Sequence, residues 1–216
     1  MKELSAKIKE VAAQSLALAE VEFVIGWQKG DFWWQSYPVF IEKGQPTDQL
    51  TWDPFCTANL GKYLLEEMAH YKKIALFVKG CDLRGINQMI QDKRLDRSRL
   101  LLFGLPCPGM VDPVKLAGAD LEKEIEEVRR ENGELVVITP GGEERLEARD
   151  YLYEKCLSCR YPNPVDYDQM LAPEVEPLRK ERFEAVSALE KLSPDERYDF
   201  WTRHFSRCLR CFACRN

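Results

Sequence analysis

The chain has 216 residues, and its formal net charge of −5 is spread over many residues of both signs. A chain of this length can bury a substantial core without cysteine cross-links, and its sequence shows no basic stripe that would indicate nucleic acid as the main partner. The longest apolar runs, such as IALFV and LLLFGL, are too short to span a bilayer, and the N-terminus lacks the apolar core of a signal peptide. We therefore expect a cytoplasmic protein with no membrane span.

The N-terminal third predicts a helix, a β-hairpin and a second helix. Apolar residues recur at helical spacing at Ile8, Val11 and Leu16. Two apolar, β-leaning segments then flank the short turn QKGD. The expected elements are a helix at 5–20, strands at 21–27 and 33–43, and a helix at 58–71.

Two strand–cysteine–helix units follow in the middle of the chain. KKIALFV (72–78) is a continuous apolar run, as expected for a strand buried on both faces. It leads into Cys81, then Asp82 as the expected N-cap, then a helix over 83–95. RLLLFGL (99–105), PCPG and a further helix repeat the pattern. Two such units imply parallel strands, so the fold class is α/β, a parallel or mixed sheet core with flanking helices.

The second half of the chain is more polar. The charged run LEKEIEEVRRE (121–131) predicts a helix with a solvated face, and residues 134–149 predict a hairpin. A later helix, at 193–206, starts with Ser193 as N-cap and Glu196 completing a capping box. The expected division is an α/β domain over 1–172, a linker over 173–192, and a helical arm over 193–216 whose last residues carry a run of cysteines.

The chain contains eight cysteines but only two histidines. Disulfides are rare in a reducing compartment, where clustered thiols more often bind metal or perform redox chemistry. With so few histidines, any metal site in this protein must be mostly thiolate. The spacing of the cysteines relative to the predicted strands then indicates which of them can share a site.

Cys81 and Cys107 each come just after a predicted parallel strand. The carboxyl ends of neighbouring parallel strands lie about 4.8 Å apart at one sheet edge, so two thiolates there can share one inorganic group. Cys156 and Cys159, in CLSC, have the two-residue spacing typical of tetrahedral thiolate sites. Four thiolates suit either structural zinc or a cubane iron–sulfur cluster, and their spacing leaves both open. We expect all four to converge on one site.

These cysteines have two other interpretations. Cys81 and Cys107, taken alone, would pass as small buried hydrophobes at strand ends. CLSC could be a catalytic dithiol, although no thioredoxin-like strand–CxxC–helix context surrounds it. The two pairs taken together favour metal.

The terminal run RHFSRCLRCFACRN places Cys208, Cys211 and Cys214 at the spacing that opens the bacterial ferredoxin pattern. Three ligands packed this closely are uncommon for zinc, so the run favours iron–sulfur. The fourth cysteine of the pattern would fall at position 218, and a remote ligand or a partner's cysteine is the alternative. His204 is expected to pack beside the cluster. Cys56 belongs to neither group; a plain buried cysteine is favoured over a thiol whose pKa is lowered by a following helix.

No catalytic constellation stands out in the sequence. There is no G-x-G-x-x-G or G-x-x-x-x-G-K-[ST] run, and no Ser/His/Asp or paired-carboxylate arrangement. No residue is therefore assigned a catalytic role. If the protein takes part in catalysis, it does so through bound cofactors.

FVKGCDLRGINQMIQDKRLDRSRLLLFGLPCPGMVD, followed by CLSCRYPNP, resembles the coenzyme F-420 hydrogenase/dehydrogenase beta-subunit family. It is similar to the branch found with formate dehydrogenase and heterodisulfide-reductase-like complexes in anaerobes, where the tail often continues as a ferredoxin-type run. The resemblance covers roughly 73–168 and the last ten residues.

That resemblance implies an iron–sulfur subunit that passes electrons between a flavin or deazaflavin and partner clusters. Carried over by position, Cys81, Cys107, Cys156 and Cys159 would hold one [4Fe-4S] cluster, and Cys208, Cys211 and Cys214 would begin a second. Family members can also carry FAD, but no flavin-contacting motif is recognisable in this sequence. The expected partners are other subunits of a hydrogenase, formate dehydrogenase or heterodisulfide-reductase-like complex. The competing hypothesis is a zinc-stabilised interaction module without redox activity.

Overall fold

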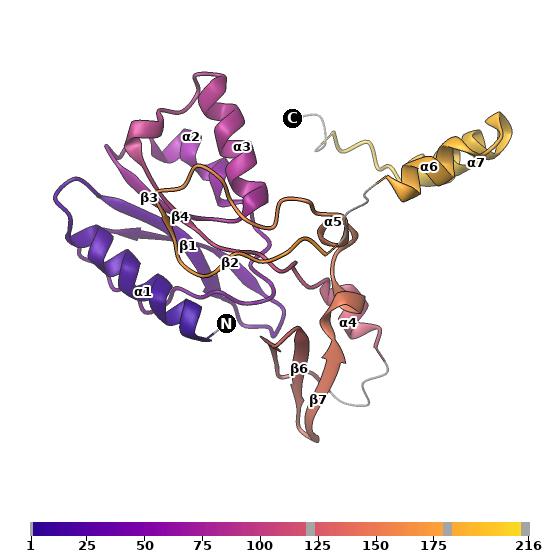
Figure 1. Ribbon diagram of the computed structural model, residues 1–216, viewed down its shortest axis with the longest axis horizontal. Coiled ribbons are helices and arrows are strands. Elements are labelled where there is room, and N and C mark those ends of the chain that lie inside the picture. The colour runs from indigo at the N-terminus through magenta and orange to yellow at the C-terminus, as the bar shows by residue number, and fades with distance from the viewer. Residues whose placement is uncertain (1, 120–123, 179–182, 213–216) are drawn as a thin grey trace. The chain divides into compact units, whose positions relative to one another are not determined.

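The computed structural model describes residues 2–119, 124–178 and 183–212 (Figure 1). The chain divides into two compact units, Met1–Arg179 and Lys180–Asn216. Among the described residues, no helix has both the length and the apolar character needed to cross a bilayer.

A five-stranded sheet forms the centre of the first unit, in the strand order β2-β1-β3-β4-β8. β2 runs antiparallel to β1, and every other neighbouring pair is parallel. The strands are β1 (Phe23–Lys29), β2 (Ser36–Glu42), β3 (Ile74–Val78), β4 (Leu100–Gly104) and β8 (Gln169–Met170). The prediction of an α/β fold with a mixed sheet is confirmed.

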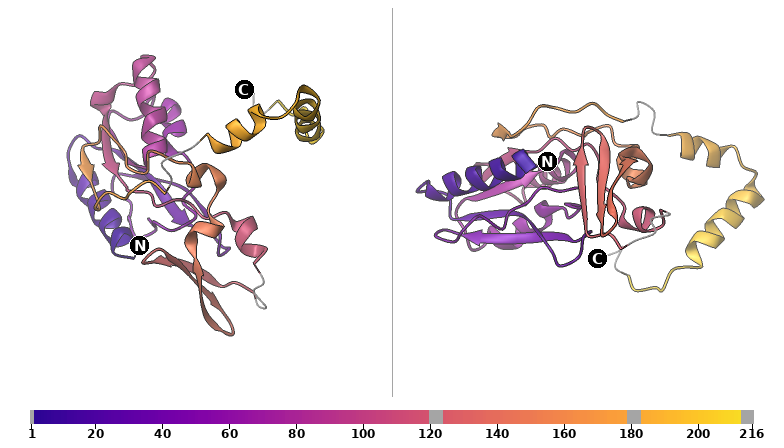
Figure 2. Two further views of the ribbon diagram at one scale, coloured as in Figure 1. Left: turned by 45° about the vertical axis from the view of Figure 1, so that its right-hand side comes forward. Right: turned by 90° about the horizontal axis from the view of Figure 1, so that it is seen from below.

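Helices cover both sides of this sheet. In Figures 1 and 2, α1 (Lys2–Ala17) and α3 (Gly80–Gln91) lie on opposite sides of the strands. All five residues of β3 are buried, which is why its sequence is continuously apolar. Ile8 of α1 and Leu83 of α3 are buried in the same apolar core as β3. The predicted N-terminal helix is thus present, shifted toward the N-terminus.

The other helical segments of this unit are short turns that connect the strands. They are η1 (Leu60–Tyr63), α2 (Leu64–Glu67), η2 (Arg97–Arg99), α4 (Pro113–Ala117), η3 (Ala148–Tyr151) and α5 (Glu154–Leu157). The helix expected over 58–71 is therefore reduced to η1 running into α2. The Asn59 side chain caps η1 by accepting a hydrogen bond from the Gly61 backbone at 2.9 Å.

A second, antiparallel sheet of three strands corrects the prediction of a helix over 121–131. Its strands are β5 (Glu127–Glu131), β6 (Glu134–Thr139) and β7 (Gly142–Glu147), in that order. Asn132 and Gly133 both have positive φ, 48° and 92°, and fold β5 onto β6. Arg129 of β5 forms an ion pair within this sheet, 2.8 Å from Glu143 of β7. Residues 121–123 of the expected helix lie outside the described residues.

Between residues 183 and 212 the second unit has two helices, α6 (Glu184–Glu190) and α7 (Pro194–Phe205). α6 lies within the segment that was expected to be a linker. α7 begins as its sequence predicts, because the Ser193 backbone donates to the Glu196 carboxylate at 2.8 Å and Ser193 Oγ accepts from the Glu196 backbone at 3.3 Å. The aromatic side chains of Tyr198, Trp201 and Phe205 are exposed.

Candidate metal centre

The strand ends place Cys81 and Cys107 at one edge of the central sheet. β3 and β4 are parallel and in register, with Val78 opposite Gly104. Cys81 and Cys107 each follow the last residue of their strand by the same interval, so they occupy equivalent places beyond that edge. The helix after Cys81 starts earlier than predicted, at Gly80 with Lys79 as N-cap, and Asp82 is its third residue rather than its N-cap. Cys81 therefore lies in the first turn of α3, at the positive end of the helix dipole.

Backbone hydrogen bonds bring the CLSC segment to the same edge. Cys156 lies in α5, and the Cys159 N–H donates to the Cys156 carbonyl at 3.2 Å. The Tyr153 N–H donates to the carbonyl of Met110 at 3.1 Å, which ties the start of α5 to the segment after Cys107. CLSC is thus held against the chain that follows β4.

All four cysteines line one cavity of about 280 Å³. The remaining wall is mostly apolar or backbone. Its other lining residues are Thr57, Asn59, Lys79, Gly80, Asp82, Pro108, Gly109, Met110, Lys155, Tyr161, Pro162, Glu176 and Leu178. The four thiols come together as the sequence predicts; that they ligate metal stays a prediction.

Two glycines let the backbone close around this cavity. A Cβ on Gly80 would collide with the carbonyl oxygens of Tyr161 and Asn163, which are backbone atoms in the loop after Cys159. Gly109 has φ +101°, a conformation that other residues rarely adopt, and a Cβ there would lie 2.6 Å from Leu152. Both positions therefore require glycine for the loops to meet.

Burial raises the pKa of the Cys81, Cys107 and Cys156 thiols and so favours their protonated forms. Desolvation raises the pKa of Cys107 to about 12, against an opposing hydrogen bond from the Gly109 backbone and the nearby Lys79 cation. Cys81 has the most exposed surface of the four, yet desolvation still raises its pKa to about 11. Desolvation also raises the pKa of Cys156, whose sulfur accepts a hydrogen bond from the Met110 N–H at 3.5 Å. A bound metal would have to displace these protons.

The residues that line the cavity decide which group it could hold. In the described part of the chain, no three Cys, His, Asp or Glu side chains are placed to hold a single metal ion. The donor set, four thiols with backbone N–H groups directed at two of the sulfurs, suits an iron–sulfur cluster.

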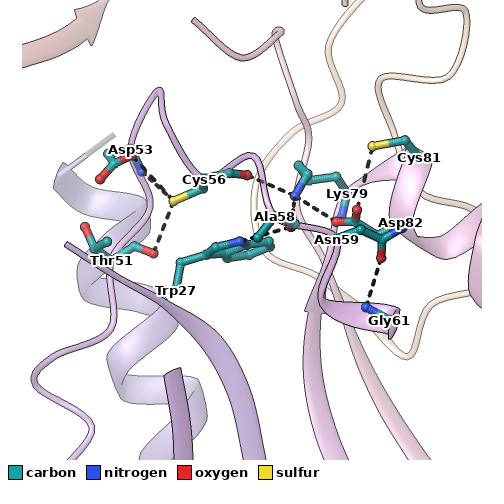
Figure 3. A network of polar contacts seen from close by, with 10 residues as sticks. All are labelled: Trp27, Thr51, Asp53, Cys56, Ala58, Asn59, Gly61, Lys79, Cys81 and Asp82. Atoms are coloured by element: carbon teal, nitrogen blue, oxygen red, sulfur yellow. Dashed lines mark hydrogen bonds and ion pairs between the residues drawn. The ribbon is translucent and has the colours of Figure 1, made fainter. Parts of the chain in front are cut away.

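Lys79 and Asp82 are site residues that the sequence analysis did not identify. Figure 3 shows Lys79 between the loop around Cys56 and the first turn of α3. Its ammonium forms a buried ion pair with Asp82 at 2.9 Å. The signal that could have found it is a lysine directly after a fully apolar strand, because a buried lysine requires partners.

Arg130 of β5 is a second residue that the sequence analysis missed. Its guanidinium donates to the carbonyls of Pro108 and Gly109 at 2.9 and 3.0 Å, and so holds the turn that follows Cys107. Desolvation lowers its pKa from the ordinary value. Because residues 127–131 were expected to form a helix with a solvated face, this inward contact was not anticipated.

The described residues include three further cysteines, Cys56, Cys208 and Cys211. Cys56 is fully buried in the main core and is absent from the cavity lining; desolvation raises its pKa well above the ordinary value, opposite to the lowering that was considered. Cys208 and Cys211 are exposed in the second unit, and Cys214 lies outside the described residues. His204 is exposed, and its ring lies 4.3 Å from that of Phe200.

Comparisons with known proteins give consistent relatives at low identity. No protein-family model matches the chain. The F420-dependent formate dehydrogenase subunit beta of Methanocaldococcus jannaschii is 20% identical, over 91% of this chain and 67% of that protein. The F420-dependent formate dehydrogenase 1 subunit beta of Methanococcus maripaludis is 22% identical, over 56% of this chain and 33% of that protein.

A solved structure shares the fold. A chain in the xenon-derivatised F420-reducing [NiFe] hydrogenase complex of Methanosarcina barkeri superposes with a TM-score of 0.58 at 16% identity. The match covers 74% of this chain and 63% of that chain. This chain thus spans from about one third to about two thirds of the length of the proteins that it matches.

Proposed function

We propose that this chain, as a member of the coenzyme F-420 hydrogenase/dehydrogenase beta-subunit family, is an iron–sulfur electron-transfer subunit of a cytoplasmic anaerobic oxidoreductase complex. The single observation that carries the proposal is that Cys81, Cys107, Cys156 and Cys159 line one cavity at the carboxyl edge of the parallel strands. Open α/β sheets place their ligands at this edge. A [4Fe-4S] cluster held there would accept and pass on single electrons.

The residues around the cavity suit such a cluster in three ways. The four thiols supply the ligands, and the N-terminal turn of α3 directs its positive end at the cavity, which favours an anionic group. Backbone N–H groups of Gly109 and Met110 bond to the sulfurs of Cys107 and Cys156. The mostly apolar remainder of the wall limits access of water.

A second cluster is proposed for the terminal run. Cys208 and Cys211 are exposed, and the Arg210 backbone donates to the Cys208 sulfur at 3.4 Å, as backbone N–H groups do around ligand sulfurs. With Cys214 they would hold an exposed cluster, at a position that suits electron exchange with another subunit. The partners would be subunits of a formate dehydrogenase, hydrogenase or heterodisulfide-reductase-like complex. FAD would belong to the same electron path.

The competing proposal is a zinc-stabilised interaction module. Anaerobically purified protein distinguishes the two, since an iron–sulfur protein is brown, contains iron and acid-labile sulfide, and absorbs broadly in the visible range. Colourless protein with stoichiometric zinc and no sulfide would overturn the electron-transfer proposal. If the protein does contain iron and sulfide, electron paramagnetic resonance of the dithionite-reduced protein counts its clusters.

A further inference from the structure

Lys79 is a fully partnered cation beside the four-cysteine cavity. Its side chain is 2% exposed and that of Asp82 is 1% exposed. The lysine ammonium has three N–H donors. These face the Cys56 carbonyl at 3.0 Å, the Ala58 carbonyl at 3.1 Å and the Asp82 carboxylate at 2.9 Å.

Further contacts fix this cation in place (Figure 3). The ammonium lies 4.2 Å from the ring centroid of Trp27, and the indole N–H of Trp27 donates to the Ala58 carbonyl at 3.2 Å. The Asp82 carboxylate also accepts from the Lys79 backbone N–H at 3.1 Å. Neither charge can rotate into solvent without breaking several bonds. Water therefore screens this pair far less than it screens surface charges.

Burying a lysine in the core costs free energy, and packing alone does not require a charged side chain at this position. Burying an ion pair is expensive, and well-packed apolar residues often do as well or better. The pair instead lines the cavity that holds the thiols, and the Lys79 charge opposes the raised pKa of Cys81, Cys107 and Cys156. Its field thus reaches three of the four sulfurs.

We infer that Lys79 and Asp82 are positioning residues that set the reduction potential of the group bound at the four cysteines. The inference rests on the proposed function. Reduction by one electron adds one negative charge in the cavity, and the potential of an iron–sulfur cluster depends on the charge around it. The buried ammonium stabilises the reduced state, and the buried carboxylate opposes it.

The test is a redox titration of the intact chain with dithionite as electron donor, followed by electron paramagnetic resonance and visible absorption. We expect Lys79→Met to lower the midpoint potential and Asp82→Asn to raise it. The double variant should fall between the two single variants. Opposite signs are the decisive readout, because loss of a purely structural contact would not move the potential in opposite directions.

Lys155→Met is the matched control. Lys155 lines the same cavity but is exposed, so solvent screens its charge and its removal should shift the potential less. A shift of the same sign in both single variants, or a Lys79→Met shift no larger than that of Lys155→Met, would overturn the inference. If Lys79→Met fails to retain the cluster, the midpoint potential of Asp82→Asn decides alone. A potential that is not higher than that of the wild type then overturns the inference.

Iron and sulfide analysis of the wild-type protein precedes the titration. It distinguishes a failure of the proposed function from a failure of this inference. Wild-type protein without a cluster would overturn the proposed function, and this inference with it. Wild-type protein with a cluster whose potential ignores Lys79 and Asp82 would overturn only the inference.

Discussion

The backbone N–H of Cys107 donates to the carbonyl of Pro162 at 2.9 Å. This bond joins the turn after β4, which carries Cys107, to the loop that follows Cys159. The loop is also pressed against the start of α3, where Gly80 faces the carbonyls of Tyr161 and Asn163. The cavity is therefore closed by backbone contacts that mutation of a neighbouring residue can open.

Gly80→Ala tests this closure directly. The added methyl would collide with two backbone carbonyls, which cannot move aside as a flexible side chain can, so we expect the loop to shift and the cluster to be lost or become labile. Gly85→Ala, in the same helix, meets only an ordinary contact at 3.8 Å and should stabilise the helix by about 0.5–1 kcal/mol. Thermal unfolding and iron content measure both effects. Equal iron retention in the two variants would contradict the proposed packing.

Replacing single cysteines should separate the four cavity thiols from Cys56. Alanine at Cys81, Cys107, Cys156 or Cys159 should remove the iron of one cluster and lower the free energy of unfolding of the loaded protein, because the metal ties the strand edge to the later loop. Cys56→Ala should keep that iron and cost about 0.5–3 kcal/mol by leaving a gap in the core. Iron analysis on each variant checks this. Loss of iron in Cys56→Ala would make Cys56 a ligand.

The raised thiol pKa values predict how the stability of the cluster-free protein depends on pH. The pKa of Cys107 is about 12 in the folded protein and near 9 in the unfolded chain. The folded state therefore favours the protonated thiol, and its contribution to stability is present below pH 9 and is lost as the pH rises toward 12. Denaturant unfolding between pH 8 and 10 should show a steeper loss of stability in the wild type than in Cys107→Ala. Parallel slopes would show that Cys107 titrates normally.

Arg130→Met should weaken the turn after Cys107. The substitution leaves the carbonyls of Pro108 and Gly109 without their charged donor, at a cost of about 1–3 kcal/mol. Arg145→Met on the same sheet is the control, because its ion pairs with Glu131 and Glu134 are exposed and worth at most about 1 kcal/mol. Chemical denaturation compares the two variants. We also expect the cluster to be released by chelators faster in Arg130→Met than in Arg145→Met.

Cys208→Ala with Cys211→Ala should remove a second cluster without disturbing the first. These residues belong to a separate compact unit, so the iron held at Cys81 and its partners should remain. Electron paramagnetic resonance of the reduced protein should lose one of two signals. An unchanged spectrum would mean that the terminal run binds no cluster in this chain.

The sequence predicts the strand edge well because local signals there agree with the fold. The apolar runs of β3 and β4, each followed by a cysteine, gave the parallel pairing and hence the convergence of Cys81 with Cys107. The two-residue spacing placed Cys156 and Cys159 together, while the hydrogen bonds that carry them to the same edge are long-range and leave no local pattern.

The prediction of a helix over 121–131, where the structure has β5, was wrong for a physical reason. Glu and Arg favour helices, and the charge pattern of 121–131 looked solvated. The stronger signal was Asn132–Gly133, a dipeptide that adopts positive φ at both positions and favours a tight hairpin turn. This turn outweighs residue propensity: it pairs β5 with β6, and from β5 Arg130 reaches the turn after Cys107. Lys79 was not predicted as a site residue because two of its three partners are backbone carbonyls of a distant loop, those of Cys56 and Ala58.

The position of the thiols along the chain bears on how the protein matures. Cys81 and Cys107 emerge from the ribosome early. The cavity is incomplete until Cys159 and the loop through Asn163 have been synthesised. Domains fold largely as units, so iron and sulfide for the proposed cluster would have to reach a sheet edge that has already formed. Cys81 has the most exposed surface of the four cysteines and is the one that solvent reaches most readily. Iron supplied after translation, in the absence of oxygen, should therefore load protein that was synthesised without it.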